Sequence, residues 1–488
     1  MIALWIILGL LGLFIVVTLI RAAFFKADKV EQGSLEEVSV DVDRYCESLT
    51  SAIQIKTISS YDHDEVDWNE FSKFHKFLEE RYPLIHKTMS KTEIGDASLI
   101  FKWEGTDPSL DGIALLAHQD VVPVAEGTEK DWEHKPFEGV NDGEFIWGRG
   151  AMDMKNHLIG VMESVESLIA EGYVPKRTLY ICLGHNEEVV AAPDNGAKAM
   201  AEYLESQGVH LEAILDEGGA ILPAKVDGVV DCNLAGVGIA EKGSVNYRIS
   251  VNAKGGHSSQ PPEHTALGDL ADVIKDIEGH QFRAKMPDYV YELFLSIGKR
   301  STYPAKLLFC NLWLLKPLVL KIMTKIPPAA SLIRTCTAVT MAQGSPAFNV
   351  LPQKASITVN FRTMPGVTIG DVEEHIRNSC RNKNIDVEYL VGKEASKISP
   401  TDSKAFKTIK SLCESTDEKN LVVPFLVMGG TDACNYENVC ENIYRFAPFV
   451  VDTSLLLCTH ATNERLPIKS VEEALKFFKR YVKIMTKD

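Results

Sequence analysis

The chain has 488 residues, of which 45% are hydrophobic and 24% are charged, a composition typical of globular proteins with a substantial core. Its 67 aspartates and glutamates outnumber 51 lysines and arginines, so the net charge of -16 gives no overall attraction for nucleic acid, which we exclude as a partner. The ten cysteines are far apart and form no C-x-x-C pair, which favours reduced thiols over a disulfide framework.

The chain begins with an uninterrupted apolar stretch over residues 2–20. As a helix this stretch extends about 28 Å, close to the roughly 30 Å hydrocarbon thickness of a bilayer. It exceeds the apolar length of most signal peptides and no positive segment precedes it, so we predict a single transmembrane anchor, with a cleaved signal as the alternative. Arg21, Lys26 and Lys29 follow the stretch, and the positive-inside rule favours the cytoplasm for the rest of the chain.

Between residues 112 and 217, short apolar runs alternate with amphipathic stretches, which is typical of an α/β domain with a mixed, largely parallel sheet. Buried strands are predicted over residues 113–117, 178–183 and 213–215. Between the first two strands, four apolar residues fall at helical spacing and predict a helix that faces the core: Leu158, Met162, Val165 and Ile169.

The pattern changes after Glu241. Residues 244–251 and 355–363 alternate as antiparallel strands do, with helical patterns after each, which predicts an inserted α+β unit. The predicted organisation is an anchor, a main domain in two segments and an insert between them: 2–20, 34–238 with 397–488, and 239–396. Within the insert, residues 312–326 are hydrophobic and basic, and form either a buried helix pair or a surface helix that touches lipid or an apolar substrate.

Acidic residues and histidines cluster just beyond the predicted strands and again near the C-terminus. Because the carboxyl ends of parallel strands converge on one crevice, these side chains are expected to meet despite their separation in sequence. Each cluster taken singly is weak evidence, but their joint occurrence points to one site. The clusters are His118 with Asp120, Asp153, Glu187 with Glu188, Asp216 with Glu217, and His460.

Nine short motifs carry these residues and the glycines around them: HQDVVPV, WGRGAMDMK, GHNEE, LDEGG, GGHSS, NVLP, NFRTMPG, GGTDA and HATNER. In their order and over nearly the whole chain after residue 40, they resemble the co-catalytic zinc metallopeptidases that include glutamate carboxypeptidase, aminoacylase and carboxypeptidase S. The sequence WEHKPFEG before WGRG is most similar to the carboxypeptidase S and N-acyl-amino-acid hydrolase branch. The resemblance implies a zinc-peptidase catalytic domain with an inserted lid or dimerisation domain.

The resemblance implies two zinc ions per subunit, with Asp153 as the bridging carboxylate. It makes His118 and Asp216 ligands of the first zinc, and Glu188 and His460 ligands of the second. Nitrogen and oxygen ligands with a position left open for water suit a catalytic zinc rather than a structural one.

By the same resemblance Glu187 is the general base, which takes a proton from the attacking water and passes it to the leaving nitrogen. Asp120 is expected to accept the second N–H of the His118 imidazole and so fix its tautomer. The peptide bond between Asp153 and Met154 is expected to be cis.

The remaining site residues are expected from the insert and from the GGTDA motif. The resemblance makes His257 the group that stabilises the oxyanion. It makes Arg362 and Asn349 the clamp for a substrate carboxylate, a role that suits the fork of an arginine. Gly429 and Gly430 are expected to complete the rim.

The leading interpretation is a membrane-anchored dizinc hydrolase of amide bonds beside a free carboxylate, in a peptide or an N-acyl amino acid. The alternatives are a peptidase that reads a free amino terminus, as aminopeptidases and dipeptidases do, and a non-catalytic anchored binding protein. Some relatives dimerise through the insert and others act alone, so a monomer and an insert-mediated homodimer both stay open. Closure over the site is expected at hinges near Gly238 and residues 394–398.

Overall fold

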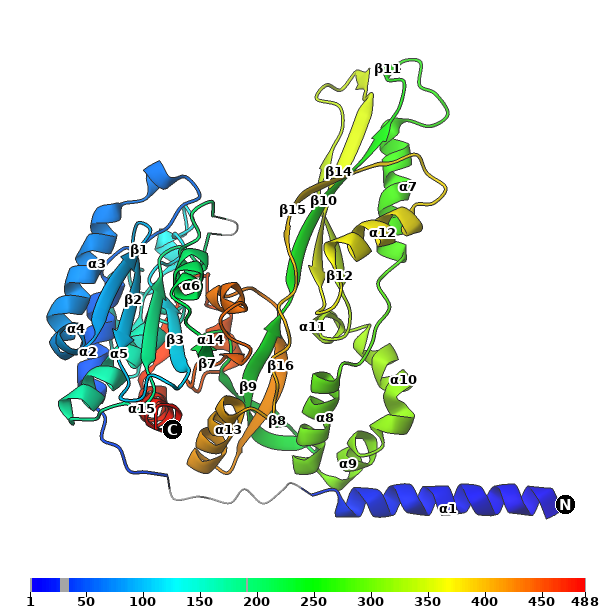
Figure 1. The fold of residues 1–488 in the computed structure, drawn as a ribbon. Coiled ribbons are helices and arrows are strands. Elements are labelled where there is room, and N and C mark those ends of the chain that lie inside the picture. The colour runs from blue at the N-terminus through cyan, green and yellow to red at the C-terminus, as the bar shows by residue number, and fades with distance from the viewer. Residues whose placement is uncertain (1, 27–34, 190–191, 488) are drawn as a thin grey trace.

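The computed structural model describes residues 2–26, 35–189 and 192–487, so the predicted domain start at residue 34 lies outside the described residues. Figure 1 shows a main α/β unit, a second unit that stands away from it, and helix α1 (Ile2–Phe24) extending from one side. The architecture is therefore α/β with an antiparallel second sheet.

In the described part of the chain, the main unit is built on a nine-stranded mixed sheet. Its centre is parallel, as predicted, but β1 and β2 at one edge and the pairings of β9 with β17 and β8 are antiparallel. The strands in spatial order are β1 (Ser90–Ile94), β2 (Ser98–Trp103), β6 (Leu179–Gly184), β3 (Gly112–His118), β7 (Leu211–Asp216), β17 (Ile443–Arg445), β9 (Val230–Glu241) and β16 (Asn420–Val427), with β8 (Ile221–Val226) beside β9.

Helices cover both faces of this sheet, which is why all seven residues of β3 are buried. Ile113 and Leu115 belong to the larger core, to which α5 and α15 contribute, whereas Ala114 and Leu116 pack with residues of α6. The helices of the main unit are α2 (Val42–Ile53), α3 (Trp68–Arg81), α4 (Pro83–Thr88), α5 (Lys155–Ala170), α6 (Gly196–Ser206), α13 (Lys404–Thr416), α14 (Thr453–Leu456) and α15 (Val471–Met485). A small sheet of β4 (Val140–Asn141), β5 (Phe145–Trp147) and β18 (Arg465–Pro467) lies beside them.

Helix α5 is the helix that the spacing of Leu158, Met162, Val165 and Ile169 predicts, and the first three of these side chains are fully buried. It packs against α15, whose apolar face includes Phe478. The N-terminus of α5 follows Asp153 by two residues, so this buried helix positions one of the candidate ligands.

The second unit is an antiparallel four-stranded sheet in the order β12 (Cys336–Gln343), β14 (Lys354–Thr363), β10 (Gly243–Asn252) and β15 (Asp386–Lys393). Its buried face packs on α7 (Ala266–Gly279) and α12 (Ile369–Ser379), which form a separate core. The short pair β11 (Gly256–His257) and β13 (Val350–Leu351) lies at the end of this unit farthest from the main sheet (Figure 1).

Between α7 and β12 the chain returns to the main unit through four helices: α8 (Asp288–Arg300), α9 (Tyr303–Phe309), α10 (Leu312–Met323) and α11 (Pro327–Ser331). Helix α8 packs on β16 and β9, and Leu312, Val319 and Met323 of α10 join the main core. On α10, however, Leu314, Leu318 and Ile322 are about half exposed. This segment thus combines the two alternatives for residues 312–326, a buried face and an apolar surface.

Helix α1 is long and apolar enough to cross a membrane by length and composition, with a mean hydropathy of 2.5 over Leu4–Phe24 and little burial. It contacts α9, and its ring pair Phe14 with Trp313 reaches α10. The side chain of Arg21 donates to the Cys310 carbonyl and lies over the Trp313 ring.

Candidate metal centre

Two histidines and three carboxylates meet at the carboxyl edge of the parallel strands. His118 is the last residue of β3, and its Nε2 atom lies 3.1 Å from Asp153 Oδ1 and 3.2 Å from Glu217 Oε1. The other oxygen of Asp153 lies 2.9 Å from Nε2 of His460, which is also 3.1 Å from the Glu188 carboxylate. Asp153 therefore presents one oxygen to each histidine, as a carboxylate that bridges two cations would.

The structure turns Glu217, and not the expected Asp216, toward His118. Asp216 ends β7, and its carboxylate instead accepts a hydrogen bond from the backbone N–H of Ala433, which ties the GGTDA loop to the strand. Successive residues at a strand end point to opposite sides, so only one of the two acids of LDEGG can face the centre. The sequence contains both acids, and its pattern does not indicate which of them does so.

Asp120 holds the Glu187–Glu188 pair in place. Its two carboxylate oxygens accept the backbone N–H groups of Glu187 and Glu188, each at 3.2 Å. The His118 Nδ1 atom lies 3.0 Å from the Asp120 carbonyl oxygen and 3.4 Å from its carboxylate. Asp120 thus contacts the imidazole mainly through its backbone, while its side chain fixes the loop that carries both glutamates.

A buried ion pair, to which sequence analysis assigned no role, fixes the backbone that carries Asp153. Glu464 is fully buried, binds the Arg149 guanidinium, and accepts the backbone N–H groups of Gly150, Met152 and Asp153. The peptide bond that follows Asp153 is cis, as expected. Arg149 lies in the motif GRGAMDMK and Glu464 in HATNER. Their place in these motifs is the feature of the sequence that could have indicated a role.

The clustered carboxylates shape the electrostatics of the centre. Burial, with Asp153 close by, raises the pKa of Glu217 to about 8, and burial raises the pKa of Glu187 well above its usual value. Hydrogen bonds to Asp153 and Glu188 raise the pKa of His460 to about 10. Neighbouring carboxylates contribute to each of these pKa shifts, and a divalent cation would compensate their negative charge. Imidazole and carboxylate donors at this spacing fit zinc.

The second unit separates the other expected site residues. Arg362 is exposed near the end of β14 that adjoins the main unit, whereas Asn349 precedes β13 at the far end, beside His257. Ten residues of β14 span about 33 Å at the usual rise per residue. Within one chain the structure therefore does not bring Arg362 and Asn349 together, nor does it bring His257 to the His118 cluster.

Gly429 and Gly430 are exposed at the start of the GGTDA loop, where sequence analysis placed the rim. The loop is fixed by Glu241, which accepts the N–H and the hydroxyl of Thr431 and pairs with the buried Arg445. Together with the Asp216 contact, this holds the loop beside the carboxyl end of β7.

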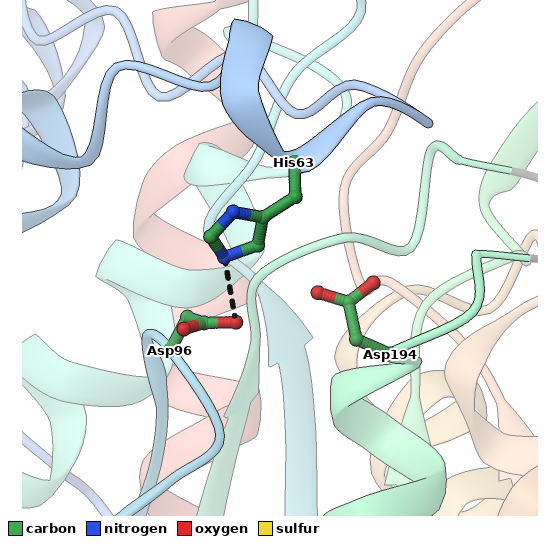
Figure 2. Close-up of side chains that lie close together, drawn as sticks. All are labelled: His63, Asp96 and Asp194. Atoms are coloured by element: carbon green, nitrogen blue, oxygen red, sulfur yellow. Dashed lines mark ion pairs between the residues drawn. The ribbon is translucent and has the colours of Figure 1, made fainter.

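A further group of possible metal ligands, His63, Asp96 and Asp194, is shown in Figure 2. His63 Nε2 lies 3.3 Å from Asp96, but all three residues are exposed. Exposed acidic groups of this kind are common on protein surfaces, and we assign no role to this one.

Comparison with known proteins identifies the class. Residues 114–484 match Peptidase family M20/M25/M40, and the chain belongs to this family. It is therefore a hydrolase of the metallopeptidase class, as the resemblance of its motifs implied.

Several relatives span almost the whole chain. It is 35% identical over 439 residues to the probable carboxypeptidase S-like 2 of Dictyostelium discoideum, covering 89% of this chain and 84% of that protein. It is 31% identical to the N-fatty-acyl-amino acid synthase/hydrolase PM20D1 of Mus musculus, covering 89% and 86%. The M20 family metallo-carboxypeptidase Sso-CP2 of Sulfolobus solfataricus shares the fold, with a TM-score of 0.63 at 16% identity over 91% of this chain and 99% of that one.

Proposed function

We propose that the protein uses two zinc ions to hydrolyse amide bonds beside a free carboxylate, either at the C-terminus of a peptide or in an N-acyl amino acid. The observation that carries this proposal is the bridging position of Asp153 between His118 and His460. Glu217 completes the first donor set and Glu188 the second. The similarity to carboxypeptidase S-like and N-fatty-acyl-amino acid hydrolase relatives supports the substrate class.

Two zinc ions at such a centre supply a polarised water and a Lewis acid for the scissile carbonyl. Glu187 is half-buried beside His118 and Glu217 and is the proposed base, because Glu188 is the glutamate of this pair that contacts His460. Asp120 orients Glu187 through the backbone N–H it accepts. Arg362 is the proposed partner of the substrate carboxylate.

The Glu187→Gln variant tests this function. Replacing the base should lower kcat on N-acyl amino acids or blocked dipeptides by about 10²- to 10⁴-fold, while zinc content stays at two per chain. Elemental analysis measures the zinc, and Glu93→Gln, an exposed acid on β1, serves as the matched control. Full activity of Glu187→Gln, or one zinc per chain at saturation in the wild type, would contradict the proposal.

We propose in addition that a second copy of the chain brings His257 and Asn349 to the centre. Both lie at the far end of the second unit, where Phe348 is fully exposed. The outer strands β12 and β15 of that unit also have exposed apolar residues, among them Met341 and Tyr389. An insert-mediated homodimer would cover such edges and deliver an oxyanion-stabilising histidine that the chain's own His118 cluster lacks.

We also propose that α1 is a transmembrane anchor and that α10 lies against the same bilayer. Leu314, Leu318, Ile322 and Ile326 recur every four residues and form one exposed apolar stripe. Trp313 packs on Phe14 of α1, which continues this stripe onto the candidate span. The lysines of this segment suit lipid headgroups, and the basic residue Arg21 at the end of the span favours the cytoplasmic side.

Fluorescence quenching tests the lipid contact. The full chain in nanodiscs with brominated lipids should show tryptophan quenching that falls when Trp313 is replaced by Phe, because Trp313 then no longer reports from the bilayer. Trp103→Phe, a buried residue of β2, is the control. Equal quenching in the wild type and Trp313→Phe would show that α10 stays in water, and protease protection in sealed vesicles would assign the side.

A further inference from the structure

A cavity of about 540 Å³ opens from the metal centre into the main unit. Its lining includes Asp153 and Glu217, two of the proposed zinc ligands. The lining also includes Leu293 of α8 and Leu332, which follows α11. The cavity therefore connects the reacting centre to the helical segment that carries the exposed stripe of α10.

The cavity exists because one face of the sheet is incompletely covered. Helix α13 packs on one side of β16, and α8 packs on the other, where Leu234, Val423 and Phe425 face it. Gly236 widens the space on β9, since a Cβ there would come within 3.3 Å of the Phe425 ring. Gly219 allows two backbones to approach closely, because its Cβ would lie 2.2 Å from the Gly236 carbonyl oxygen.

The lining is apolar away from the centre. Among the described residues that line the cavity, Asp153 and Glu217 are the ones with an ionisable carboxylate. His157 is the basic residue of the lining, and burial lowers its pKa to about 3, so it is neutral at physiological pH. Burial of a charged substrate group against this apolar lining would be unfavourable, whereas burial of an alkyl group would be favourable.

The size of the cavity exceeds what an amino-acid side chain fills. About 30 Å³ per water-sized group gives room for roughly 18 groups in 540 Å³, which is more than the heavy atoms of any side chain. It is within the usual range for ligand sites. An unbranched acyl chain attached to the scissile carbonyl has this size and this lack of charge.

We propose that this cavity binds the acyl chain of an N-acyl amino acid, so that the enzyme prefers long unbranched acyl groups to acetyl groups or peptides. The proposal rests on the proposed amidohydrolase function and adds the substrate class. The scissile carbonyl of the substrate would lie at Asp153 and Glu217, and its acyl chain would extend along Leu234 and Val423 toward Leu293.

The wild-type full chain should therefore show kcat/KM that rises roughly two- to fourfold per added methylene across N-acetyl, N-octanoyl, N-dodecanoyl and N-palmitoyl substrates, below their micellar concentrations. A blocked dipeptide with a bulky apolar side chain is included as the rival substrate. Equal kcat/KM across the series, or a higher value for the dipeptide, overturns the proposal.

Variants that fill the cavity beside α8 test where the acyl chain binds. Leu293→Trp should lower kcat/KM for the palmitoyl substrate by at least tenfold and leave the acetyl substrate within twofold, since only a long chain reaches this residue. Leu295→Trp on the same helix, outside the lining, is the matched control, and Leu332→Phe replaces Leu293→Trp if that protein does not fold.

The outcomes of the series distinguish the two proposals. Loss of activity on long and short substrates alike in Leu293→Trp, with Leu295→Trp unaffected, contradicts acyl binding in this cavity but not hydrolysis. Absence of zinc-dependent hydrolysis of every substrate by the wild type contradicts the proposed function itself.

Discussion

At the scale of single residues, buried carboxylates fix the backbone around Asp153 and the Glu187–Glu188 pair of the candidate metal centre. Glu464 receives three backbone N–H groups around Asp153, and Asp120 receives those of Glu187 and Glu188. The carboxylates of Glu464 and Asp120 thus restrain the backbone that carries the proposed ligands, and not the ligand side chains directly. This pre-organisation reduces the ordering that metal binding would otherwise require.

His157 provides a test of the buried lining through pH. Burial lowers the pKa of His157 from 6.5 to about 3. Between these pH values the imidazole is therefore protonated in the unfolded chain but neutral in the folded protein. Above pH 6.5 this difference has no effect on the free energy of unfolding. Below pH 6.5 it lowers the free energy of unfolding by about 1 kcal/mol per pH unit. The wild-type Tm should accordingly fall more steeply than that of His157→Gln between about pH 7.5 and 5.5.

An exposed histidine provides the control for this comparison. His264→Gln should reproduce the wild-type pH dependence of Tm, because its side chain is in water. Parallel Tm curves for the wild type and His157→Gln would show that His157 is not kept neutral by burial.

The residue scale also marks where sequence reasoning stops. The strand-end pattern predicted that His118, Asp153, Glu188 and His460 would meet, and the structure places them together. It could not choose between Asp216 and Glu217, because adjacent acids have the same chemistry and differ only in direction. The roles of Glu464 and Asp120 as acceptors of backbone N–H groups depend on loop conformation, which spacing does not encode.

At the scale of elements, periodicity predicted the strands and the core helix because their burial repeats along the sequence. Residues 244–251 and 355–363 are parts of β10 and β14, and residues 158–169 are part of α5. The position of α8–α11 was not predictable in this way. An apolar stripe indicates that a helix is covered, but the core that covers it can belong to either unit.

The contact between α5 and α15 yields a stability prediction at this scale. A Cβ on Gly160 would come within 2.9 Å of the Phe478 ring, and both helices are buried where they meet. Gly160→Ala should therefore lower the free energy of unfolding by about 1–3 kcal/mol despite the better helix propensity of alanine. Thermal or chemical denaturation measures the change.

A second helical glycine is the matched control. Gly268 on α7 is exposed, and its Cβ would meet its first neighbour only at 3.7 Å. Gly268→Ala should raise the free energy of unfolding by about 0.5–1 kcal/mol. If Gly160→Ala is equally stabilising, the close packing of α5 on α15 is not as described.

At the scale of the whole molecule, the separation of His257 from the metal centre leads to a complementation test. Glu187→Gln and His257→Ala should each be inactive alone. Mixed dimers contain one site with an intact Glu187 that receives His257 from the other chain, so random mixing should restore about a quarter of wild-type activity.

Differently tagged chains purified together report whether mixed dimers form. Activity that stays absent in such purified mixed dimers would show that His257 does not act across copies. A Glu187→Gln chain mixed with itself is the control, since it has no intact base in any site.

The route of the chain between its two units has a mechanical consequence. Because α8–α11 interrupt the second unit and pack back on β9 and β16, the chain crosses the junction four times within the described residues, before and after β10–α7 and before and after β12–β15. The two middle crossings are joined by the hydrogen bond from Lys285 N–H to the Ile333 carbonyl at 2.8 Å. Swinging the second unit about Gly238 and residues 394–398 would therefore pull on Leu332 in the lining of the cavity. Opening of the junction and entry of an acyl chain would then be parts of one movement.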